Sequence, residues 1–267
     1  AHAIGIAAGM AGGLRGNFGT MTKALGPGLA AQHGVLAAKL AHQGFTANPD
    51  VLEAHEGFVA MFCGREHARP GRALDNIGAP FEVEQPGVVF KIYPNCSLIH
   101  TTIDMVLDGV AAREIAAEAV RAVDVEISPR LDRMRVKVRP EGALQAKFSV
   151  EYAVACALLR QAVGVAEFTD GVLADQAVRG MMDKVSVHVG DGFGEDNGDL
   201  AAIRVTDRQG GTWSHTLAKP RGHRTNPLPP GALERKFVDG AAATLGRERA
   251  AVAWRALLGL EEARCRE

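Results

Sequence analysis

The chain has 267 residues, of which 47% are hydrophobic and 23% are charged, a composition typical of a folded globular protein. Its 30 lysines and arginines balance 31 aspartates and glutamates, so it lacks the basic surplus that binds a nucleic-acid backbone. A chain of this length favours two subdomains over a single core.

Residues 1–14 are almost all Ala, Gly, Ile, Leu and Met, which predicts a helix without a polar face. The stretch has no basic flank, is broken by glycines and is too short to cross a bilayer, so it is interpreted as neither a signal peptide nor a membrane helix. No capping residue precedes it. We therefore expect the chain to begin inside a helix whose covering partners lie upstream.

Helical periodicity continues from about residue 28 to residue 62, with leucines and alanines at helical spacing. The pair Asn48 and Pro49 predicts a break, followed at once by a second helix. The stretch 64–89 is rich in Gly, Pro and charge, which indicates a domain boundary. These patterns predict a helical domain over residues 1–89.

Beyond the boundary, the segment 91–100 turns into a helix, and residues 147–159 are again helical in pattern. Residues 131–139 alternate apolar and charged side chains, which predicts a half-buried strand. Three more alternating runs, which begin at residues 184, 201 and 212, are separated by Gly- and Asp-rich turns. Together they predict an antiparallel meander.

The segment 221–230 predicts a loop, and the pattern from Ala232 to the end is helical. The chain therefore divides into a helical domain, an α+β domain over residues 90–221 and a helical return to the first domain over residues 222–267. The predicted fold class is α+β, with a mostly helical domain and a smaller α+β domain.

Several motifs that resemble binding sites lack the pattern that such sites require. The glycines at 9–19 follow no strand, which argues against a dinucleotide loop. The loop 191–199 lacks the spacing that calcium requires and is interpreted as a solvated hairpin loop. Nine histidines and four cysteines show no metal-ligand spacing, so no metal is expected. No GxSxG elbow occurs. Scattered cysteines without a CxxC pair indicate a reducing compartment, which predicts a cytoplasmic protein.

Two long blocks carry a family resemblance. Residues 19–46 and 51–62 resemble the helical-domain signature of the MmgE/PrpD family, the 2-methylcitrate dehydratase-like enzymes. The block KIYPNCSLIHTTID at 91–104 resembles the family's lysine, Tyr-Pro, Cys or His, then His arrangement at the entrance to its lid domain. Weaker blocks follow in the same order, at residues 146–158, 203–213 and 219–237. The chain thus resembles the carboxy-terminal part of the family's chain.

The resemblance implies an enzyme with a helical body and a smaller α+β lid, active as a homodimer without metal or organic cofactor. It implies a lyase that acts on small polycarboxylates, as in 2-methylcitrate dehydration during propionate catabolism. Alternatives within the family are decarboxylation of cis-aconitate and epimerisation or isomerisation, as of iminodisuccinate. A non-catalytic subunit from a split gene is the alternative of a different class. No membrane or nucleic-acid partner is expected.

The resemblance also implies site residues. Lys23 and Lys91 match active-site lysines that bind a carboxylate or donate a proton; the alternative is a solvated surface lysine. Tyr93 is expected to bind substrate. Cys96 takes part in proton transfer, lines the pocket or is a small buried hydrophobe. His100 is either the site's imidazole or a helix-start histidine satisfied by backbone, and it shares a face with Cys96 if the helix has begun there.

Two departures from the family's pattern limit these expectations. Many members have a histidine three residues after the lysine that matches Lys23, whereas this sequence has Gly26. Either that imidazole is dispensable or the substrate differs. The family's first half, with further histidines, has no counterpart here, so we expect the chain alone to be an incomplete enzyme that binds substrate without turning it over.

Overall fold

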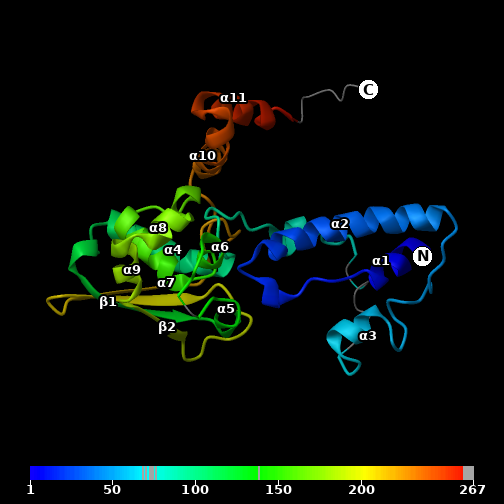
Figure 1. Cartoon of the computed structure of the whole chain (residues 1–267). Helices are drawn as coiled ribbons and strands as arrows, with labels where there is room; N and C mark the ends of the chain where they lie inside the picture. The colour runs from blue at the N-terminus through cyan, green and yellow to red at the C-terminus, as the bar shows by residue number, and fades with distance from the viewer. Residues whose placement is uncertain (68, 70, 72–74, 76, 138, 261–267) are drawn as a thin grey trace. The chain divides into compact units, whose positions relative to one another are not determined.

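Helices dominate the first of the two units into which the chain divides, and a small sheet lies in the second. The computed structural model describes residues 1–260 except 68, 70, 72–74, 76 and 138 (Figure 1). Its units are residues 1–87 and 88–267. The predicted α+β class is confirmed. Within the described residues, no helix is both long and apolar enough to span a membrane.

The first unit contains α1 (His2–Gly9), α2 (Met21–His42) and α3 (Phe58–Cys63). The first predicted helix ends at Gly9, earlier than the apolar run. The second predicted helix starts at Met21 rather than near residue 28, because Thr20 is extended and Pro27 is accommodated within the helix. The α1 and α2 helices pack on each other.

The helix predicted to follow Asn48 and Pro49 begins only at Phe58, so that start was wrong. The chain between them forms turns, in which the backbone nitrogen of Phe58 donates to the oxygen of Val51. A side chain at Gly57 would collide with that same oxygen, so the turn closes tightly here. Part of the predicted loose stretch at 64–89 lies outside the described residues.

The second unit is built on one four-stranded sheet among the described residues. Its strands are β1 (Val120–Ile127), β2 (Val185–Val189), β3 (Ala201–Asp207) and β4 (Thr212–Leu217). They lie in the order β2-β1-β3-β4. The β1 and β2 strands are parallel, with Val123 opposite Val185, whereas β1–β3 and β3–β4 are antiparallel.

Two predictions about strands were wrong in part. The runs at 184, 201 and 212 do form strands, but not a meander, because β1 lies between β2 and β3. The predicted strand at 131–139 is instead the short helix α5 (Pro129–Asp132) and a following loop; residue 138 lies outside the described residues. Ser128 caps this helix, because its Oγ accepts from the nitrogen of Leu131 at 3.2 Å.

Helices α4 (His100–Ala111) and α7 (Val150–Arg160) cover one face of the sheet, as Figure 1 shows. Both match predicted helical segments. The core of this unit contains fully buried apolar side chains of both helices, of Ile99 before α4 and of β1: Ile99, Ile103, Val106, Val123, Val125, Ile127, Tyr152 and Val154. The remaining short elements of this unit are η4 (Ser97–Ile99), η5 (Ala117–Ala119), α6 (Ala143–Ala146), η6 (Val165–Glu167), α8 (Asp170–Ala174) and α9 (Gln176–Met182).

The predicted loop at 221–230 is confirmed, and two helices follow it, α10 (Ala232–Leu245) and α11 (Arg247–Leu258). They are separated at Gly246, whose φ of 78° no helix interior adopts. The rings of Phe237 and Trp254 pack at 5.5 Å between centroids and hold the pair together. The last predicted helical residues, 261–267, lie outside the described residues. That residues 222–267 return to the first domain stays a prediction.

Candidate functional site

The two predicted lysines belong to different units. Lys23 is exposed on α2, with its ammonium 5.2 Å from the ring centroid of Phe18. Lys91 lies in the second unit, where its Nζ donates to the carbonyl oxygen of Asn95 at 3.5 Å. Their matches to active-site lysines on two different domains of the family predict that the two ammonium groups meet in one anion-binding pocket. This stays a prediction, and the geometry below concerns the second unit alone.

His100 is the first residue of α4 and is only 1% exposed. Burial and, to a smaller extent, the positive charges of Lys91 and Lys236 lower the pKa of its imidazole from 6.5 to about 3, while hydrogen bonds to the backbone carbonyls of Asn95 and Tyr93 act in the opposite direction. Its Nε2 has no partner among the described residues. The hydrogen bonds to the carbonyls are therefore assigned to Nδ1. This assigns the proton of the neutral ring to Nδ1 and a lone pair to Nε2.

Tyr93 packs its ring edge-on against the imidazole of His100, with centroids 5.0 Å apart. Its hydroxyl donates to Oδ1 of Asp104 at 2.6 Å. Burial raises the pKa of Tyr93 above its ordinary range, and the Asp104 charge raises it further. The hydroxyl proton is therefore committed to Asp104, so the oxygen of Tyr93 can offer a substrate only an acceptor.

Asp104 and Arg221 were not predicted as site residues. The Asp104 carboxylate is fully buried, and Arg221 donates to it from its backbone nitrogen at 2.7 Å and from Nη1 at 3.2 Å. Arg221 also bonds to Asp108, one turn further along α4. One feature of the sequence could have pointed to Asp104. It lies four residues after His100, which places both residues on one face of a helix.

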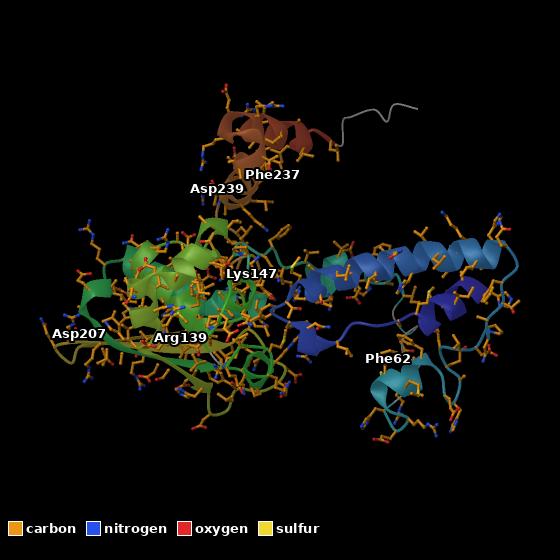
Figure 2. All side chains as sticks on the ribbon, in the orientation of Figure 1. Phe62, Arg139, Lys147, Asp207, Phe237 and Asp239 are labelled. Carbon is orange, nitrogen blue, oxygen red and sulfur yellow. The ribbon has the colours of Figure 1, made fainter. Side chains whose placement is uncertain are left out.

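Cys96 lies just before the helical region, not on it. Its backbone is extended, and the 3-10 turn begins at Ser97, so it shares no helical face with His100. Its side chain is buried, and its nitrogen donates at 3.0 Å to the backbone oxygen of Lys147, a residue labelled in Figure 2. The burial fits a small hydrophobe, one of the alternatives that the sequence left open, and a part of Cys96 in proton transfer stays a prediction.

Asn95 adds two buried polar atoms that the sequence did not single out. Both atoms of its carboxamide lack hydrogen-bond partners within the described residues, as do Nε2 of His100 and Oγ1 of Thr102. Buried polar atoms are rarely left unpaired. The backbone carbonyl of Asn95 accepts a hydrogen bond from Lys91. The Asn95 side-chain amide, the His100 lone pair and the Lys91 cation therefore all belong to the short segment 91–100.

The loop 191–199 joins two strands that are not neighbours, so the predicted hairpin loop is instead a crossover connection. Asp199 binds Lys219 at 3.0 Å, and its backbone oxygen accepts from Thr101. Across the part of the chain that the structure describes, no group of three or more His, Cys, Asp or Glu side chains is placed to hold a metal ion.

Comparison with known proteins agrees with the helical first unit and the α+β second unit. Residues 93–262 match the MmgE/PrpD C-terminal domain, and residues 1–70 match the MmgE/PrpD N-terminal domain. The chain therefore belongs to the MmgE/PrpD family.

Its curated relatives include three proteins named cis-aconitate decarboxylase. The one from Homo sapiens is 28% identical over 253 residues, which cover 91% of this chain and 51% of the relative. The one from Aspergillus terreus is 27% identical over 278 residues, with 97% and 56% covered. The one from Mus musculus is 26% identical over 258 residues, with 92% and 51% covered. The chain spans about half the length of these relatives.

Proposed function

We propose that this chain carries part of the active site of a decarboxylase that acts on a small unsaturated polycarboxylate of the cis-aconitate type. The observation that carries the proposal is the group formed by the Lys91 ammonium, the Asn95 amide and the buried imidazole of His100. The names of the relatives favour decarboxylation over the dehydration of 2-methylcitrate that the sequence suggested first.

The chemistry asks for a cation and a proton donor. When CO₂ leaves the methylene-linked carboxylate of cis-aconitate, the C–C bonding pair forms a new terminal double bond. The original alkene pair then moves to the carbon beside another carboxylate, and that carbon takes up one proton. Negative charge builds on this carboxylate during the step, so an ammonium placed beside it, such as that of Lys91, lowers the barrier.

His100 is suited to carry that proton once substrate is bound. Alone, the buried imidazole is neutral, because its pKa is lowered to about 3. A polycarboxylate placed beside it favours the charged ring, since an opposite charge within about 4–6 Å raises the pKa of a histidine. When the substrate binds, the ring takes up a proton at Nε2. It then gives this proton to the carbanion that develops as CO₂ leaves.

Dehydration remains the second candidate because of the same Nε2. A neutral ring with an unpaired lone pair is a general base, and the loss of water from a citrate begins with removal of a proton beside a carboxylate. The two reactions differ in what is released. The test measures CO₂ release from cis-aconitate and alkene formation from citrate and 2-methylcitrate, with this chain alone and with any polypeptide encoded immediately upstream added separately. Alkene formation without CO₂ release would replace the proposal by the dehydratase.

Replacing Lys91 with alanine is expected to weaken the binding of cis-aconitate about tenfold, because a charge-assisted hydrogen bond to a carboxylate is lost. Isothermal titration calorimetry measures the change. The matched control is Lys184→Ala, because the Lys184 ammonium also donates to a backbone carbonyl, that of Val120, at 2.7 Å. Equal loss of affinity in both variants would show that Lys91 has no special part in binding.

A further inference from the structure

Asp104 receives three hydrogen bonds although its side chain is fully buried. The donors are the hydroxyl of Tyr93 at 2.6 Å, the backbone nitrogen of Arg221 at 2.7 Å and Nη1 of Arg221 at 3.2 Å. Removing a buried carboxylate from water is costly unless such donors replace the water. This carboxylate thus ties together three parts of the chain: the 91–96 segment, α4 and the loop after β4.

The loop is fastened to the same segment at a second point. The nitrogen of Phe90 donates to the oxygen of Gly222 at 3.0 Å, and the nitrogen of Gly222 donates to the oxygen of Asn226 at 2.9 Å. Arg221 reaches Asp108 as well as Asp104, so its guanidinium spans one turn of α4. Phe90, which precedes Lys91, is therefore hydrogen-bonded to Gly222, which follows Arg221, and the loop and the segment are fixed to each other.

Tyr93 links this segment to the imidazole. Its hydroxyl is bound to Asp104, and its ring edge packs on His100 at 5.0 Å. Because its hydroxyl is hydrogen-bonded, the Tyr93 ring cannot rotate freely about χ1. The aromatic surface that packs on His100 is therefore fixed. The Arg221 guanidinium balances the charge of Asp104, so the carboxylate can orient Tyr93 without an ion pair to His100.

We propose that Asp104 is a positioning residue, which acts through Tyr93 to hold His100 buried with Nε2 unpaired among the described residues, and through Arg221 to fasten the 219–226 loop to the same segment. The orientation of His100 is a property of the unliganded chain. Only its consequence for turnover rests on the proposed function.

The test follows the titration of His100 by NMR in the 267-residue chain labelled at histidine, without substrate. The signal is assigned by its loss in His100→Gln. In the unchanged chain, His100 is expected to stay neutral from pH 8 down to about 4.5. In Asp104→Asn, the amide NH₂ replaces one of the two carboxylate oxygens. It cannot accept a hydrogen bond, so the bond from Tyr93 or from Arg221 is lost. The freed Tyr93 ring then lets water reach His100, which raises its pKa, and this effect is expected to outweigh the Arg221 charge left unbalanced. The titration midpoint is therefore expected to rise by about one pH unit or more.

Tyr93→Phe keeps the ring and removes the donor, so the same rise is expected there, and this variant decides the matter if Asp104→Asn does not fold. The matched control is Asp132→Asn, because Asp132 also binds two cations, Arg135 at 2.9 Å and Lys137 at 2.6 Å. A His100 midpoint unchanged in Tyr93→Phe, or raised equally in Asp132→Asn, overturns the proposal.

The binding of cis-aconitate to the same variants separates this proposal from the proposed function. A shifted His100 titration in a chain that binds no polycarboxylate supports the positioning role and removes the function. Binding of cis-aconitate together with an unshifted His100 titration in Tyr93→Phe supports the proposed function and removes the positioning role.

Discussion

Acidification from about pH 6.5 to 4.5 is expected to lower the free energy of unfolding by about 2–3 kcal/mol through His100 alone. Its folded-state pKa is lowered to about 3, whereas the unfolded imidazole titrates near 6.5. Between these values the unfolded chain binds a proton that the folded chain refuses, so stability falls as the pH falls. Because His100 is 1% exposed, solvent screens this effect little.

The measurement is urea denaturation at several pH values, for the unchanged chain and for His100→Gln. Asp104 works in the opposite direction, since burial raises its pKa and stability from that group falls as the pH rises above its ordinary value of 3.8. Asp104 is present in both chains, so the difference between them isolates His100. His215, which is exposed, serves as the control: His215→Gln should retain the full slope. An identical pH slope in His100→Gln would contradict the prediction.

Replacing Gly222 with alanine is expected to destabilise the second unit by about 3 kcal/mol or more. Gly222 has a φ of 92°, which L residues rarely adopt, and a Cβ there would collide with the backbone oxygen of Phe90. The loop must therefore separate from the segment that carries Lys91. The hydrogen bond from Phe90 to Gly222 should be lost with it.

The matched control is Gly210→Ala. Gly210 has a φ of 88°, but a Cβ there would meet nothing within 4 Å, so only the backbone strain of about 1–2 kcal/mol remains. Thermal or urea unfolding of both variants gives the comparison. If Gly210→Ala is as destabilised as Gly222→Ala, the collision with Phe90 contributes nothing.

Local pattern was sufficient to predict much of the secondary structure. Strand β3 has the periodicity of a half-buried strand, because its apolar residues face the core. Strand β4 alternates in sequence although its residues are only half-buried or exposed, and helix α7 is buried along most of its length. Strand β1 was missed although its burial also alternates. The pattern at 131–139 was misleading, because Arg135 is 10% exposed and is bound to Asp132 and Glu151 rather than pointing to solvent from a strand.

Strand order could not be predicted, since it depends on contacts distant in sequence. The site was predictable only in its first half for the same reason. The resemblance predicted Lys91, Tyr93 and His100 as site residues. It gave no reason to select Asp104, because a lone aspartate on an amphipathic helix is usually solvated. The burial of Asp104 depends on Arg221, which follows it in the chain only after the whole sheet.

The central place of β1 in the sheet affects how the chain must fold during synthesis. Strand β1 leaves the ribosome before either of its neighbours, so its apolar row waits for β2 and β3. Pairing over such a separation is slow, and a strand with both edges unpaired is prone to aggregate. A nascent chain halted between β1 and β2 would therefore expose the very surface that forms the core of the finished unit, and it would depend on chaperones to remain soluble.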